Sequence, residues 1–174
     1  TFDSIVVNKK EADKLEVYLF SETLVSHAQY GYLTPMLALE INTTSDTLPV
    51  DTLDIVAGNA ENTITAGSFD INTFTYSGSC YYYVDPVALK IGVVDPYFAW
   101  RLNKGKLAID AQGNILTAGN FYNGKHFTMR YTAPVNTALE DIVLPKQQSV
   151  KYIQNGKLII RNNGAEYDVV GKKL

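Results

Sequence analysis

Leu15-Glu16-Val17-Tyr18-Leu19-Phe20 and Met36-Leu37-Ala38-Leu39-Glu40-Ile41 decide the fold, because each carries apolar side chains on alternate positions over a short run. Side chains of a β-strand point alternately to two faces, so such a run is typical of a strand with at least one buried face. Runs of the same kind recur along the chain, at 81–84, 89–94, 106–110 and 126–131. Each of them predicts a further strand.

Turn signals separate these runs. Asn123-Gly124, Asn155-Gly156 and Asn163-Gly164 are the clearest, and Asn103-Lys104-Gly105 and Gln112-Gly113-Asn114 are similar. Asn-Gly pairs take positive φ readily and close two-residue hairpins between antiparallel strands. Several short strands at this spacing favour an all-β protein, and we expect a hairpin-built antiparallel barrel or a β-sandwich.

Helix is scarce in the pattern. Residues 8–15 have the signature of a short helix, with Asn8 as cap and Glu11 three residues later. Residues 43–51 are polar and threonine-rich, and we expect them to form a loop.

The chain of 174 residues is long enough to bury a core, and its length is typical of one domain with a small addition. We expect a barrel or sandwich domain at 1–133, a linker at 134–149 that contains two prolines, and a C-terminal β-hairpin tail at 150–174.

The charge and the cysteine content exclude several classes. The net charge is −3, which gives no electrostatic reason to expect a nucleic-acid partner. No apolar run approaches the roughly 18 residues that a membrane-spanning helix needs, so we expect no transmembrane segment. Cys80 is the single cysteine, which excludes an internal disulfide.

The tail has a distinctive pattern of minimal strands and tight turns. Val150–Gln154 and Lys157–Arg161 are joined by Asn155-Gly156, and a third run, Ala165–Val170, precedes Gly171. This pattern resembles the C-terminal tails of exported proteins of the Bacteroidota. The resemblance implies a secreted or cell-envelope protein, in the periplasm or at the outer-membrane surface, either as a lipoprotein or as the end of a larger secreted protein. Residues 146–174 also carry six lysine and arginine residues against two acidic ones, so the tail could be attracted to the acidic remainder of the chain, or it could associate with the outer membrane or the export machinery.

A second pattern lies upstream of the tail. Ile64-Thr65-Ala66-Gly67-Ser68-Phe69 recurs as Leu116-Thr117-Ala118-Gly119-Asn120-Phe121, through two related hairpins or by chance. A hairpin followed by Gly-[Ser/Asn]-Phe and an aromatic strand resembles the calycin-like β-barrel domains of exported Bacteroidota proteins. The resemblance implies a barrel of the size that is filled by side chains or holds one small ligand.

Aromatic residues gather in the middle and later strands, chiefly at 81–83, 97–100, 121–122 and 127–131. Alternation places Tyr82 opposite Tyr81 and Tyr83, and it places Tyr97 opposite Phe98 and Trp100. One set must line the core, whereas the other could present rigid amphipathic rings to a sugar or a protein. The alternative for each residue is core or cross-strand packing. As ligand-binding residues we predict Tyr82, Tyr97, Trp100 and Tyr122.

Catalytic and metal-binding candidates are weak. Cys80 with His27 or His126 could form a nucleophile and base, but no peptidase signature surrounds it, and a lone cysteine is usually a small buried hydrophobe. Asp46, Asp51, Asp54 and Glu61 lack the spacing of a calcium loop, and two histidines make no conventional zinc site. We predict no catalytic residue, no metal site and no cofactor.

These observations favour a non-enzymatic, exported or cell-envelope binding protein, with a carbohydrate or a protein as ligand on the tyrosine-rich sheet faces. One alternative is a secreted protease inhibitor that presents the loop 43–51. The other is an enzyme of an unrecognised type, for which a polar pocket containing His126 with Cys80 or a carboxylate would be the mark.

Overall fold

The computed structural model describes residues 1–90, 96–134, 150–154, 157–162 and 165–167. The chain divides into two compact units, Thr1–Pro134 and Val135–Leu174. The predicted linker, apart from its first residue, lies outside the described residues.

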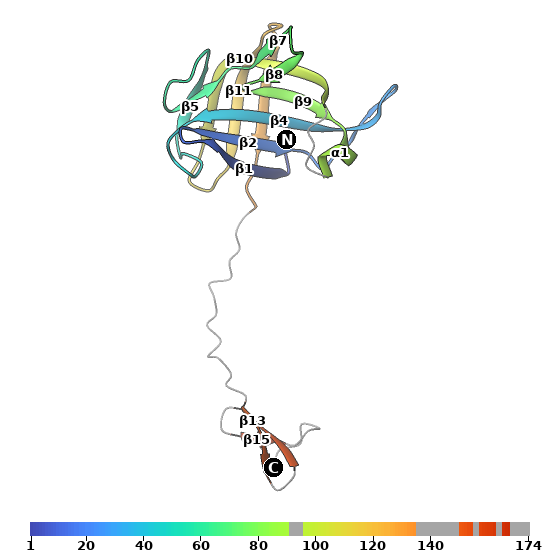
Figure 1. Ribbon diagram of the computed structural model, residues 1–174, viewed down its shortest axis with the longest axis vertical. Helices are drawn as coiled ribbons and strands as arrows, with labels where there is room; N and C mark the ends of the chain where they lie inside the picture. The colour runs from blue at the N-terminus through green and yellow to red at the C-terminus, as the bar shows by residue number, and fades with distance from the viewer. Residues whose placement is uncertain (91–95, 135–149, 155–156, 163–164, 168–174) are drawn as a thin grey trace. The chain divides into compact units, whose positions relative to one another are not determined.

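The first unit is a closed antiparallel β-barrel with extra strands, so the all-β prediction is confirmed and the barrel is the form it takes (Figure 1). Its main strands are β1 (Ser4–Glu11), β2 (Lys14–Phe20), β4 (Gly31–Asn42), β5 (Thr52–Val56), β6 (Thr63–Thr65), β9 (Cys80–Val84), β10 (Pro96–Ile109), β11 (Ile115–Phe121) and β12 (His126–Tyr131). The shorter elements are β3 (Val25–His27), β7 (Ser68–Asp70), β8 (Thr75–Ser77) and α1 (Pro86–Lys90).

The sheet follows the order β1-β2-β4-β6-β5-β10-β11-β12. A parallel bridge between Phe2 and Tyr131 brings the last strand back to the start of the chain, which closes the barrel. All pairings along this path are antiparallel except that of β5 with β6. None of the helices in the described residues is long and apolar enough to cross a membrane.

Two strands, β6 and β9, pair with different parts of β4. The C-terminal end of β4 pairs with β6, and its N-terminal half pairs with β9. Between them the chain leaves this line at Gly67, forms the small β7–β8 hairpin, and returns at Ser79, which makes a parallel bridge with Ala66. The hairpin is therefore an excursion from a single strand position, and in Figure 1 it lies beside β9 and β10.

The core has two parts because several strands are apolar on both faces. Leu15, Val17 and Leu19 of β2 point to the barrel interior with Leu37 and Leu39 of β4. The opposite face of the same strands forms a smaller cluster around Met36, Cys80, Tyr82 and Val84, against which pack Tyr76 of β8 and Leu89 of α1. The hairpin and α1 thus cover part of the outer surface of the barrel.

One local prediction is wrong, and another is wrong at its first two residues. The expected helix at 8–15 is instead the end of β1, a turn and the start of β2, because Asn8 pairs with Glu16 across the β1–β2 ladder. The expected strand at 89–94 begins inside α1, where Asp85 caps the helix by accepting the backbone N–H groups of Val87 and Ala88 at 2.6 and 3.1 Å. Residues 91–94 of that prediction lie outside the described residues.

The second unit contains three short antiparallel strands in the order β13-β14-β15, at the positions that the tail pattern predicts. They are β13 (Val150–Gln154), β14 (Lys157–Asn162) and β15 (Ala165–Tyr167).

Candidate binding site

A pocket of about 230 Å³ lies where the β7–β8 hairpin meets the middle of β10 and the end of β11. We call it the Arg101 pocket, and its lining residues are Phe69, Tyr76, Ala99, Trp100, Arg101, Phe121, Tyr122 and Asn123. Five of the eight described residues that line it are aromatic, and Arg101 is the one charged residue among them. Tryptophan occurs once in the chain, as Trp100, so the tryptophan fluorescence comes from a residue of this pocket.

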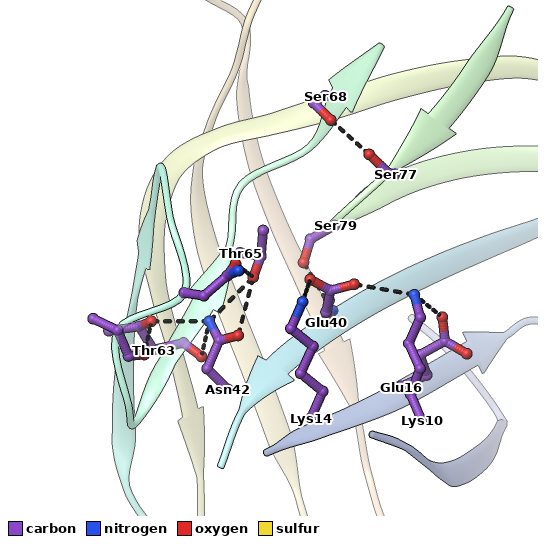
Figure 2. Close-up of polar contacts among 12 residues, drawn as sticks. Lys10, Lys14, Glu16, Glu40, Asn42, Thr63, Thr65, Ser68, Ser77 and Ser79 are labelled. Carbon is purple, nitrogen blue, oxygen red and sulfur yellow. Dashed lines mark hydrogen bonds and ion pairs between the residues drawn. The ribbon is translucent and has the colours of Figure 1, made fainter. Parts of the chain in front are cut away.

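The hairpin wall is held by side chains of both strands. The ring centres of Phe69 and Tyr76 are 4.7 Å apart, and the hydroxyls of Ser68 and Ser77 lie 2.6 Å from each other (Figure 2). Gly67, at the foot of the hairpin, lies so close to β10 that an added Cβ would come within 2.9 Å of the Arg101 Cβ. This close approach places the hairpin directly beside Arg101.

Arg101 is fixed by the turn after β11. Its guanidinium lies 4.5 Å from the centre of the Tyr122 ring, a cation–π contact, and its carbonyl oxygen accepts the backbone N–H of Tyr122 at 3.1 Å. The register between β10 and β11 shifts between Leu102 and Lys104, and such a bulge commonly redirects side chains beside a site. Within the described part of the chain, no carboxylate forms an ion pair with Arg101.

Packed rings behind the pocket hold Trp100 in place. Its ring centre lies 5.8 Å from that of Tyr81, 5.6 Å from that of Tyr83 and 6.1 Å from that of Phe98. Phe121 continues this group into the core through Phe127, with ring centres 4.8 Å apart. Rings that contact one another on several sides cannot reorient freely, so the pocket is preformed.

The structure brings two of the predicted ligand-binding residues together, Trp100 and Tyr122. Tyr82 is only 7 % exposed and lies behind the pocket wall, where its ring contacts Tyr76 at 6.1 Å. Tyr97 is 39 % exposed and stacks on Tyr30 at 4.7 Å, outside the pocket. Sequence reasoning missed Phe69, Tyr76, Arg101 and Asn123. For Arg101 a signal existed, since it is the only charged residue between Pro96 and Asn103.

A larger apolar groove lies on the outer face of β1, β2 and β4, with a volume of about 1190 Å³. We call it the outer groove. Tyr18, Phe20, Tyr30, Tyr32 and Met36 contribute to its lining, and α1 contributes Val87 and Leu89. Tyr32 is 65 % exposed. Sequence reasoning missed this groove, although the apolar residues on both faces of 17–20 were a signal for it.

The same outer face is polar at its other end. The Glu40 carboxylate is buried and forms ion pairs with Lys10 and Lys14, at 3.2 and 3.3 Å, while Lys10 also reaches Glu16 at 2.8 Å (Figure 2). Burial of the Glu40 carboxyl acts to raise its pKa, but the hydrogen bonds from Lys10 and Thr65 and the charges of both lysines outweigh it and lower the pKa. Tyr18 joins this network to the outer groove by donating to Glu16 at 3.1 Å.

The residues considered for catalysis, Cys80, His27 and His126, do not form a common site. Cys80 is buried, and its burial raises the pKa of the thiol to about 11, so that the nucleophilic thiolate is scarce at neutral pH. His27 contacts the rings of Tyr30 and Phe98, and His126 is exposed on β12. Among the described residues, no group of three or more histidine, cysteine, aspartate or glutamate side chains could hold a metal ion.

The loop at 43–51 is anchored to β1. Lys9 Nζ donates to the carbonyl oxygens of Thr44 and Ser45 at 3.1 and 2.8 Å, and it pairs with Asp46 at 3.3 Å. Leu48 packs against the core. This part of the chain therefore lies against the barrel.

Comparison of the chain with protein families, with curated proteins and with solved structures gives no match in any of the three.

Proposed function

We propose that this protein is a non-enzymatic binding protein, exported or located in the cell envelope, that holds a carbohydrate in the Arg101 pocket. The observation that carries the proposal is the grouping of Phe69, Tyr76 and Tyr122 around one small pocket beside the hydrogen-bonding side chains of Arg101 and Asn123. Aromatic faces pack against the C–H face of a sugar ring, and amide and guanidinium groups bind its hydroxyls. The location rests on the resemblance of the tail.

The size of the pocket favours a sugar ring over a protein surface. About 230 Å³ is below the range of roughly 300–1,000 Å³ that is typical of pockets for drug-sized ligands. One ring, as part of a longer glycan, suits this volume, whereas a protein interface normally covers a much wider area.

The fluorescence of Trp100 offers a direct test. The full chain is titrated with a panel of neutral and charged oligosaccharides, and the emission of this single tryptophan is followed. We expect saturable changes with at least one glycan, reduced by Tyr122→Ala and unchanged by Tyr32→Ala, which alters the outer groove instead. An absence of saturable change across the panel, confirmed by calorimetry, would reject the proposal.

A protein partner is the second candidate function, and the outer groove is the observation that favours it. A groove of about 1190 Å³ lined by Tyr18, Phe20, Tyr32 and Leu89 has the aromatic content of many protein interfaces. In that case Tyr32→Ala, rather than Tyr122→Ala, would abolish capture of the partner.

A further inference from the structure

We infer that the sugar bound in the Arg101 pocket carries a carboxylate, as a uronic acid does, and that Arg101 recognises this group. The inference rests on the proposed function and names the substrate class for the same site. Three features of the pocket support it: the unpaired charge of Arg101, the free donors of its guanidinium, and the residues of the lining.

Arg101 differs from the other cations of the barrel. Lys9, Lys10, Lys14 and Lys106 each form an ion pair with a carboxylate. The remaining lysine and arginine residues with described side chains are exposed to water, and they are Lys90, Lys104, Lys125 and Arg130. Arg101 is thus the one half-buried cation without an ion pair in the part of the chain whose side chains the structure describes. Partial burial of an unpaired charge is unfavourable, and an anionic ligand would relieve it.

The guanidinium of Arg101 is held in one orientation, but no described residue uses its hydrogen-bond donors. The contact with the Tyr122 ring does not pair the guanidinium N–H donors with any carboxylate or carbonyl oxygen. Within the described residues, the side chain of Arg101 makes no hydrogen bond. Guanidinium N–H groups match the two oxygens of a carboxylate and bind them in parallel. Holding the group against Tyr122 reduces the conformational freedom that is lost when the ligand binds.

The lining of the pocket favours a carboxylated sugar over an acidic side chain of a protein. Phe69, Tyr76 and Tyr122 supply ring surface that the short aliphatic stem of aspartate or glutamate would leave largely uncovered. A pyranose covers it and presents hydroxyls to Asn123. None of the described residues that line the pocket is acidic, so none of them opposes the positive charge of Arg101 there.

Matched pairs of sugars test the inference. The methyl glycosides of glucuronic, galacturonic and mannuronic acid are compared with those of glucose, galactose and mannose, which differ only by a hydroxymethyl group in place of the carboxylate. Binding to the full chain is followed by Trp100 fluorescence and by calorimetry. In at least one pair we expect the acid to bind about 10- to 100-fold more tightly, as a hydrogen-bonded charge contact provides. Rising salt should reduce this preference.

Substitution of Arg101 separates the possible outcomes. Arg101→Gln should reduce the preference to about twofold or less and leave the neutral sugar unaffected, and Arg101→Lys should restore only part of it. Lys104→Gln, at an exposed cation of the same strand, is the control. Equal binding of acid and neutral sugars by the native protein rejects the carboxylate inference and leaves the carbohydrate function standing, whether or not Arg101→Gln folds. If neither the acid nor the neutral sugars bind and acetylated glutamate peptides bind instead, both the carboxylate inference and the carbohydrate function are rejected.

Discussion

The guanidinium of Arg101 lies 4.5 Å from the ring centre of Tyr122, and the backbone N–H of Tyr122 donates to the carbonyl oxygen of Arg101 at 3.1 Å. The two residues come from different elements, β10 and the β11–β12 turn, and they are joined through both side chain and backbone. The side-chain contact can therefore be removed while the backbone hydrogen bond keeps the turn in place.

Replacement of the Tyr122 ring should weaken ligand binding more than folding. Tyr122→Leu removes the cation–π contact, which at an exposed site contributes about 0.5–1 kcal/mol to stability. Tyr122 is 46 % exposed, so we expect a loss of that order in thermal unfolding. Tyr122→Phe keeps the ring and should behave like the native protein. Equal ligand affinity for the leucine and phenylalanine variants would contradict this role of the ring.

Gly67 should tolerate no side chain. An added Cβ would collide with the carbonyl oxygen of Ser79 and come within 2.9 Å of the Arg101 Cβ. We expect Gly67→Ala to lower the free energy of unfolding by about 1–3 kcal/mol, as overpacking does, and to weaken ligand binding as well. The control is Gly31→Ala, at the start of β4, where φ is +75° but nothing lies within 4 Å. It should cost about 1 kcal/mol through backbone strain alone and leave the pocket intact.

The Glu40 network should make the barrel acid-sensitive. The folded pKa of Glu40 is lowered, so its stabilising contribution is complete above the unfolded pKa, near 4.3, and is lost as the pH falls through the folded value. Glu40→Gln should reduce the free energy of unfolding at pH 7 by about 1–3 kcal/mol and flatten its decline below about pH 4.3. Denaturant titrations between pH 3 and pH 7 measure both effects.

An exposed ion pair supplies the control for this experiment. Asp54→Asn breaks the pair with Lys106, in which both side chains are well exposed, and should change stability by less than about 1 kcal/mol. An acid profile of Glu40→Gln that matches the native one would show that Glu40 does not determine the response.

Cys80 should resist alkylation in the folded protein. Its thiol is buried with a pKa raised to about 11, so both access and thiolate content are low at pH 8. Mass spectrometry after treatment with iodoacetamide should show no modification under native conditions and complete modification in guanidinium chloride. We also expect Cys80→Ala to retain ligand binding. Rapid native labelling would show that the cluster around Met36 and Tyr82 opens readily.

Lys9 should control the loop at 43–51. Lys9→Gln removes the donors to the Thr44 and Ser45 carbonyls and the ion pair with Asp46. We expect amide exchange in residues 44–48 to accelerate by up to about tenfold. Lys125→Gln is the control, because Lys125 is exposed elsewhere in the barrel. Inhibition of a peptidase by the native chain, lost when the loop is loosened, would instead favour the inhibitor alternative.

The strands could be predicted where alternation reflects a single buried face. Leu15-Glu16-Val17 in β2 shows this pattern, because Leu15 and Val17 are buried and Glu16 is only partly so. The helix predicted at Asn8 was wrong because a capping pattern describes only local hydrogen bonds, whereas β1 is stabilised by pairing with β2. Pairing partners distant in the sequence are not encoded in such local signals.

The candidate site could be predicted only in part. Trp100 and Tyr122 were found because aromatic residues are dense in their segments. Phe69 and Tyr76 were not, since their distance from Arg101 depends on how the β7–β8 hairpin folds back. The repeated Thr-Ala-Gly segment has a common physical basis in the close approach of Gly67 and of Gly119 to a neighbouring backbone. The two segments are not equivalent hairpins, because 116–121 lies within β11 while 64–69 leaves the main sheet.

The excursion of the chain between Gly67 and Ser79 separates the closure of the sheet from the shape of the pocket. The strands on either side of it, β6 and β9, hold their places beside β4 whatever the length of the hairpin between them. Insertions, deletions or exchanged rings in that hairpin would reshape one wall of the pocket without disturbing closure of the sheet. Relatives of this protein could thus diverge in what they capture while keeping the same barrel, and a graft of foreign sequence at this hairpin is the natural route to engineer a new specificity.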